Sequence, residues 1–332
     1  AAAWFGLFSE ASSAISELQT HLEVAVQRDT NDKESEKKLQ IFDERILSQM
    51  LRVRAHLIDI YLTSPWRASM HADDRGRVAA DFQNRRRYTS ASLVDLQLAE
   101  NQLVRQYRHF MSSAVTEFRG RQLQLSVIVG KLSDNSSEIR KDAFFSYWSY
   151  IESHEEELQS LFQKLLENRN RQAQTLGENS YVPLAFAELG RLDYTTADCK
   201  KFRDAIAEHV IPVTNELAKY QALNLRTRSV KPWDVNSWPQ LTPTTPPGNG
   251  NLEEILQGFQ RMLKKIHPSF ESMFTELKQR NLIDVEPRKH KAAGAFCVTF
   301  QESGLPFIFG NFAGTLRDGL TLVHEFGHAI HG

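Results

Sequence analysis

The segment His324-Glu325-Phe326-Gly327-His328 has the residue types and spacing that most directly suggest chemistry in this 332-residue chain. On a helix, residues four positions apart lie one turn apart on the same face, so the imidazoles of His324 and His328 would converge on one point. That spacing suits two of the four positions around a tetrahedral zinc ion. Glu325 lies about 100° around the helix from His324, where its carboxylate can reach a water at the metal without being a ligand. The pattern predicts metal-assisted hydrolysis.

A third histidine, His331, continues the same face of the predicted helix, so three of the 11 histidines fall within residues 324–331. We expect His331 to support the two ligands or to have a structural role, rather than to bind the metal as a third ligand. The alternative for the whole group is a set of surface histidines near a helix C-terminus, where the helix dipole favours positive charge. The placement of all three on one predicted helix favours the metal site.

Two short strands and a capped helix are predicted to position this motif. Residues 295–300 are β-prone and follow a glycine, residues 301–304 are typical of a turn, and residues 306–309 form a second short strand. Thr315 and Asp318 have the spacing of a capping box, so the final helix should begin there. Its other side is apolar, with the histidines on the polar side; the apolar residues are Leu316, Leu320, Val323 and Ile330.

The first strand of this hairpin is a candidate for binding substrate. An edge strand beside a zinc-binding helix can pair with an extended peptide through main-chain hydrogen bonds. Gly294 and Ala295 have little side-chain bulk to block such a peptide. We expect the strand that begins Gly294, Ala295, Phe296 to lie beside the helix bearing His324, with Ala295 facing the cleft. The alternative is a purely structural hairpin that packs Phe296 and Val298.

The rest of the chain has mainly helical periodicity, and we find no internal repeat. Apolar residues recur every three or four positions in four long segments, and we expect these stripes to form the core. Residues up to about 190 should be almost wholly helical, with strands confined to roughly 290–312 and short pieces nearby. The stripes run over residues 46–60, 144–165, 202–220 and 252–277.

Composition excludes several classes of protein and partner. The 40 basic and 41 acidic residues nearly balance, so nothing points to nucleic acid or to an anionic membrane as the main partner. No apolar run approaches the roughly 20 residues of a membrane span. The cysteines, Cys199 and Cys297, lie far apart, which excludes a disulfide framework and favours a reducing, cytoplasmic compartment.

Several segments together resemble the oligoendopeptidase F and thimet-oligopeptidase-like zinc peptidases, over residues from about 135 to 332. The resemblance rests on residues 294–297, 306–308, 311–318 and 321–331, and further back on residues 191–195, 231–234 and 282–285. It implies His324 and His328 as zinc ligands, Glu325 as catalytic base, one Zn²⁺ per site, and short peptides as substrates. Two positions depart from it, because His290 and Ala295 stand where glycine is expected.

The resulting fold class is mainly α. We predict a multi-helix N-terminal domain over residues 1–190, followed over residues 191–332 by the N-terminal part of a helical, zincin-like catalytic domain with a small antiparallel β-hairpin. The resemblance also implies a third zinc ligand, a Glu on a later helix, and His and Tyr residues later still that stabilise the transition state; the sequence given contains none of these. We therefore expect this 332-residue chain, as an N-terminal fragment of such an enzyme, to be inactive.

Two other functions remain open. One is a catalytically dead helical scaffold or binding protein that retains the motif by descent. The other is a zinc aminopeptidase with the same pair of histidines, although no Gly-Ala-Met-Glu-Asn segment of the exopeptidase type precedes the motif. The sequence does not indicate an oligomeric state.

Overall fold

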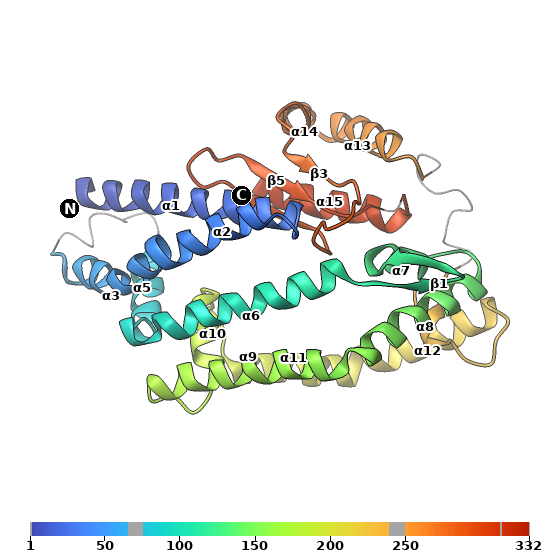
Figure 1. Ribbon diagram of the computed structural model, residues 1–332, viewed down its shortest axis with the longest axis horizontal. Helices are drawn as coiled ribbons and strands as arrows, with labels where there is room; N and C mark the ends of the chain where they lie inside the picture. The colour runs from blue at the N-terminus through green and yellow to red at the C-terminus, as the bar shows by residue number, and fades with distance from the viewer. Residues whose placement is uncertain (1, 66–75, 239–249, 313, 332) are drawn as a thin grey trace. The chain divides into compact units, whose positions relative to one another are not determined.

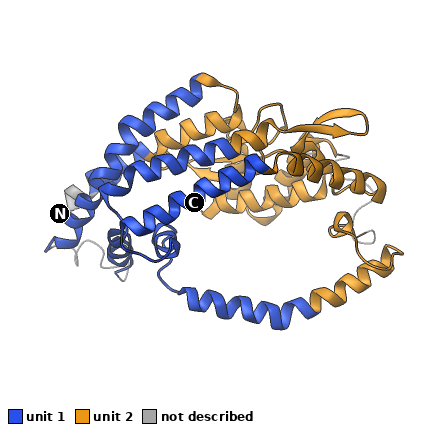
Figure 2. Cartoon of the chain, turned by 60° about the horizontal axis from the view of Figure 1, so that its bottom comes forward, with its two compact units in different colours: residues 1–15, 34–107, 156–212 blue, residues 16–33, 108–155, 213–332 orange. Residues whose placement is uncertain are grey.

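Helices make up most of the chain in the computed structural model, which describes residues 2–65, 76–238, 250–312 and 314–331 (Figure 1). No helix in these ranges is long and apolar enough to cross a membrane. The chain divides into two compact units, each built from segments that are distant in sequence (Figure 2). The domain division expected between residues 190 and 191 stays a prediction. The first unit comprises residues 1–15, 34–107 and 156–212. The second unit comprises residues 16–33, 108–155 and 213–332.

The first unit is helical. Its helices include α2 (Lys33–Phe42), α3 (Ser48–Thr63), α5 (Arg77–Arg87), α9 (Glu155–Thr175), α10 (Val182–Glu188), α11 (Thr196–Ala205) and most of α6 (Val94–Ser113). Polar bonds tie neighbouring helices together within it. Arg86 donates to both carboxylate oxygens of Asp59, at 2.7 and 3.0 Å, and the buried amide of Gln172 donates to Glu100 at 2.7 Å.

The second unit contains the predicted hairpin and the motif helix. Its helices are α7 (Leu125–Lys131), α8 (Ser137–Ser153), α12 (Ile211–Asn224), α13 (Leu252–Ile266), α14 (Pro268–Gln279) and α15 (Leu316–His331), together with the end of α1 (Ala2–Arg28). Strands β4 (Phe296–Thr299) and β5 (Pro306–Phe309) pair antiparallel, with Cys297 opposite Ile308. The predicted hairpin is therefore confirmed to within one residue.

The hairpin belongs to a three-stranded sheet of order β3-β5-β4. Strand β3 (Ile283–Asp284) pairs parallel to β5, with Ile283 opposite Ile308. A short strand near residues 290–312 was expected, but its parallel pairing was not. Every residue of β5 is buried, because apolar clusters cover both faces of the strand: Ile308 belongs to one cluster, and Phe307 and Phe309 to another. Strand β5 lies between the other two strands. Strand β4 is consequently an edge strand, as the substrate-binding hypothesis requires.

A second hairpin contradicts the expectation that strands are confined to the end of the chain. Strands β1 (Val115–Phe118) and β2 (Arg121–Gln124) pair antiparallel around Arg119 and Gly120, whose φ angles are 50° and 78°. Two consecutive positive φ angles are typical of the type I′ turn of two-residue hairpins, for which Asn-Gly is the usual sequence signal. Arg119 occupies the first position in place of asparagine, so the sequence lacks the usual signal for this turn.

Of the four stripes expected to form the core, all within the described residues, only the one over residues 252–277 contains buried residues, namely Ile255, Phe259 and Leu277. The stripe residues over 46–60, 144–165 and 202–220 are half-buried or exposed, and the apolar face predicted for α15 is exposed as well. In the stripe between residues 202 and 220, Ile206 is half-buried and the other apolar residues of the stripe are 47 to 69 % exposed.

On α15, Leu316, Leu320, Val323 and Ile330 are 40 to 62 % exposed and lie beside the exposed histidines, not opposite them. Periodicity indicates that a helix has an apolar face, but it does not show which part of the fold covers that face. The buried side of α15 is instead formed by Leu322, Phe326 and Ala329.

Candidate metal centre

Helix α15 is fixed at its start by the predicted capping box. The Thr315 backbone N–H donates to Asp318 Oδ2 at 2.7 Å, and the Asp318 N–H donates to Thr315 Oγ1 at 3.3 Å. Along the helix, Phe326 packs edge-to-face on Phe259 of α13 and Phe274 of α14, with ring centroids 5.4 and 5.7 Å apart. The cap sets where the helix begins and the aromatic cluster sets its rotation, so together they determine where the histidines point.

The two histidines converge as their spacing predicts. Their Nε2 atoms lie 3.1 Å apart and their ring planes are nearly perpendicular, at 89°. Two nitrogens bound to one tetrahedral zinc at about 2.0–2.1 Å would be separated by about 3.4 Å. His324 and His328 therefore fit two ligand positions of such an ion. Within the described part of the chain no group of three or more His, Cys, Asp and Glu side chains could hold a metal, and His331 is exposed.

Glu325 faces inward from the histidines. Only 6 % of the residue is exposed. Burial, and after it the negative charge of Glu325, raises the pKa of Cys297 on β4 to about 11. The carboxylate thus lies on the side of α15 that packs against the edge strand, away from bulk water. A carboxylate in such an environment interacts strongly with nearby charge, because the local dielectric is low.

The segment before β4 is held in place by two polar anchors. The Asn311 side-chain amide donates to the carbonyls of Ala292 and Gly294, at 2.7 and 3.2 Å. Deeper in the unit, the buried Lys291 ammonium donates to Asp284 Oδ1 at 2.8 Å and to backbone carbonyls of Asp284, Glu286 and Gly310. Gly294 itself has a φ of 96°, which favours glycine. These contacts fix the backbone that leads into the edge strand.

The Asp284 carboxylate forms hydrogen-bonded ion pairs with three cationic side chains. It accepts hydrogen bonds from Arg28, Arg288 and Lys291 at 2.7 to 2.9 Å. Burial raises the pKa of Asp284, but the hydrogen bonds from Arg288 and Lys291 outweigh this effect and hold that pKa well below its usual range. This ionic cluster secures α1 and the loop after β3 to the sheet.

The predicted substrate strand shows features of both hypotheses. Strand β4 packs against α15, and Ala295, immediately before it, is half-buried and lines a cavity. Phe296 stacks on Phe309 of β5, with ring centroids 4.7 Å apart and planes 17° from parallel. Phe296 therefore has a packing role, whereas Gly294 and Ala295 border open space.

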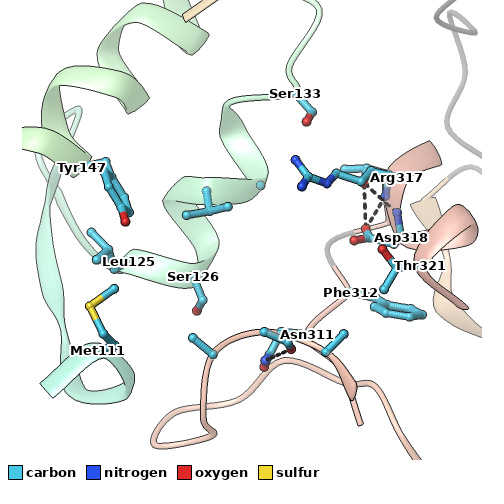
Figure 3. Close-up of a pocket in the computed structure, with 16 residues that line it drawn as sticks. Met111, Leu125, Ser126, Ser133, Tyr147, Asn311, Phe312, Arg317, Asp318 and Thr321 are labelled. Carbon is cyan, nitrogen blue, oxygen red and sulfur yellow. Dashed lines mark hydrogen bonds between the residues drawn. The ribbon is translucent and has the colours of Figure 1, made fainter. Parts of the chain in front are cut away.

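A cavity with a volume of about 390 Å³ lies beside α15 (Figure 3). Thr321, one of its lining residues, lies about one helical turn before His324. One wall is formed by the polar face of α15, and the opposite wall by Ser126 on α7, Tyr147 on α8 and Ser133 in the connection between these helices. Sequence reasoning assigned no role to Arg317 or Thr321, although their positions seven and three residues before His324 place them on the histidine side of the helix. That spacing was the signal that could have identified them.

Comparison with known proteins identifies solved peptidase structures that are similar to this chain. The chain is similar to a protein described as an oligoendopeptidase F from Bacillus anthracis strain Ames, with 26 % identity, a TM-score of 0.89, and coverage of 96 % of this chain and 58 % of that one. It is also similar to PZ peptidase A solved with an inhibitor, with 26 % identity, a TM-score of 0.90, and coverage of 96 % and 56 %. No curated protein matches the chain.

The chain thus spans somewhat more than half the length of these two structures. Residues 131–332, which include the hairpin, the motif helix and the cavity walls formed by α8 and α15, match the family model of peptidase family M3. This match covers more than half of the sequence, so the chain belongs to peptidase family M3.

Proposed function

We propose that this chain carries the metal-binding pair and the general base of a zinc-dependent metalloendopeptidase that hydrolyses short peptides. The observation that carries the proposal is the 3.1 Å separation of the two Nε2 atoms beside an inward-facing Glu325. Membership of peptidase family M3 supports the reaction class. Because the solved relatives are longer than the region matched, the activity of the whole protein is part of the proposal.

In this mechanism His324 and His328 hold the ion, with His331 beside them. Zinc, when bound, acts as a Lewis acid that polarises the scissile carbonyl and acidifies a water. The Glu325 carboxylate accepts the proton of the water as the water attacks the carbonyl carbon. It then delivers this proton to the nitrogen of the leaving amine. Burial of Glu325 favours this role, because the carboxylate is held in one place without a shell of bulk water.

The peptide is proposed to lie along the free edge of β4. That edge is not paired by β5, which occupies the other side of β4. Main-chain groups from Gly294 to Phe296 would pair with the substrate backbone, and the small Ala295 side chain leaves room for it. This arrangement suits extended peptides in general.

The remaining parts of the proposal concern the cellular compartment and the two alternative functions. Both cysteines are free, which is compatible with a cytoplasmic location. The scaffold hypothesis draws its support from the two-donor site, since the described residues bring together only two of the ligands a zinc enzyme needs. The aminopeptidase hypothesis has no comparable observation in its favour.

A quenched-fluorescent peptide assay tests the proposal. The protein is expressed from its full native reading frame, both as the wild type and as the Glu325→Gln variant. Zinc-dependent cleavage inside the peptide, abolished by Glu325→Gln, is the expected result. Cleavage only of the N-terminal residue would indicate the aminopeptidase, and zinc-loaded protein without any cleavage would indicate the scaffold.

A further inference from the structure

The cavity beside the motif contains a cation whose charge the proposed mechanism does not use. Arg317 lies in the first turn of α15, and its guanidinium points into the cavity and away from Asp318 (Figure 3). Among the described residues no ion pair with Arg317 is formed. Asp318, the carboxylate that also lines the cavity, accepts two hydrogen bonds from Thr315 at 2.7 and 2.9 Å. Both bonds are accepted by Oδ2, so this oxygen of Asp318 caps the helix.

We propose that this cavity is a subsite for a carboxylate of the peptide substrate, with Arg317 as the residue that determines this specificity; the inference rests on the proposed function. A guanidinium presents paired N–H donors that match a carboxylate. The hydroxyls of Ser126, Ser133 and Tyr147 on the opposite wall are further donors. The volume of about 390 Å³ is sufficient for an amino-acid side chain or a chain terminus.

The substrate path leads into this cavity. Gly294 and Ala295, which begin the proposed peptide-binding edge, line the cavity together with Arg317 and Thr321. A peptide paired with β4 would thus extend from the metal site toward Arg317. Asn311, which also lines the cavity, holds the carbonyl of Gly294 and keeps this path open.

The spacing between Arg317 and His324 on α15 predicts which position of the peptide carries the carboxylate. Arg317 precedes His324 by seven residues, which corresponds to about 10 Å along a helix axis. An extended peptide advances about 3.3 Å per residue. The preferred carboxylate should therefore lie about three residues from the bond that is cleaved. It can be the side chain of Asp or Glu or the C-terminus of the peptide, since both present the same group.

Binding to the non-hydrolysing Glu325→Gln form of the native reading-frame protein tests this subsite. Fluorescein-labelled hexapeptides carry a single Asp, moved through the sequence, and each is paired with its Asn counterpart. A second pair compares a free C-terminus with an amide. Cleavage positions are mapped by mass spectrometry with the wild-type protein.

We expect Asp, or the free C-terminus, to tighten binding about tenfold over its neutral counterpart at one position, about three residues from the scissile bond. Arg317→Gln should abolish this preference and Arg317→Lys should retain part of it, while affinity for the neutral peptides stays unchanged. Arg261→Gln, a change of an exposed arginine on α13, is the matched control and should leave the preference intact.

Three results would overturn the subsite, and they separate it from the proposed function. Equal binding of acidic and neutral peptides, with cleavage intact, removes the subsite and leaves the peptidase. A preference that persists in Arg317→Gln assigns it to another residue. No peptide binding and no cleavage by the wild-type protein removes both proposals.

Discussion

The Nε2 atoms of His324 and His328 lie 3.1 Å apart on the exposed side of α15, one helical turn from each other. This separation is close to that of two nitrogens on one tetrahedral ion. The direction in which both side chains point depends on the rotation of α15, which is set by the packing of Phe326 against Phe259 and Phe274 on the other side of the helix. The apolar core of the second unit thus places the two metal donors.

The first prediction concerns Glu325. Glu325→Gln removes the proton acceptor but keeps the shape of the side chain, so turnover should fall by about 10² to 10⁴-fold. Zinc content, measured by atomic absorption, should not change, because Glu325 is not a ligand. Glu302→Gln, an exposed change in the β4–β5 turn, is the control and should be fully active. Comparable activity of Glu325→Gln would remove Glu325 from the mechanism.

The second prediction concerns the edge strand. Ala295→Leu places three more carbon atoms at the border of the cavity, where the peptide backbone is proposed to pass. KM for short peptides should rise severalfold, while kcat changes little, since the metal site is untouched. Gln301→Leu, in the exposed turn of the same hairpin, should leave KM as it is. An unchanged KM in Ala295→Leu would favour the purely structural hairpin.

The third prediction concerns acid stability. The folded-state pKa of Asp284 is lowered relative to the unfolded value of about 3.9. Its contribution to the free energy of unfolding is therefore fully present above about pH 4 and is lost as the pH falls further, toward the folded-state pKa. Urea midpoints measured from pH 7 to pH 3 should show this loss.

Asp284→Asn provides the comparison for that experiment. It leaves the buried Lys291 without its anionic partner, so the free energy of unfolding should fall by about 3 kcal/mol at pH 7 and vary less with acid. Asp204→Asn, in the exposed pair with Lys200, should change neither the midpoint nor its pH dependence to a comparable extent. Equal acid sensitivity of wild type and Asp284→Asn would contradict the assignment.

The fourth prediction concerns His290, which stands where the family resemblance expects glycine. Its φ of 63° lies in the left-handed region that favours glycine, and its carbonyl accepts hydrogen bonds from the Thr30 N–H at 2.7 Å and hydroxyl at 2.9 Å. His290→Gly keeps that carbonyl and removes the strain, so it should stabilise the fold by up to about 1 kcal/mol. His290→Val should destabilise it, because β-branched residues disfavour this conformation. Thermal unfolding that ranks valine above glycine would refute this account.

The parts of the fold that were predictable depend on local chemistry. The capping box of Thr315 and Asp318, the hairpin and the convergence of His324 with His328 each involve residues only a few positions apart. Strand β3 has only two residues, and its partner β5 lies more than twenty positions away, so no local pattern marks it. The cavity likewise depends on the approach of α7 and α8 to α15, which sequence spacing does not encode.

Zinc titration of the 332-residue chain, paired with a quenched-fluorescent peptide assay, tests the central claim most directly. Two described donors should bind zinc weakly and reversibly, with loss of binding in His324→Ala and His328→Ala and on acidification, because only neutral imidazoles bind metal. His21→Ala, at a histidine remote in sequence from the motif, should bind as wild type. Peptide cleavage by this form should be absent or barely detectable. Tight, stoichiometric zinc with normal cleavage would contradict the account, and it would make His331 or an upstream carboxylate the third ligand.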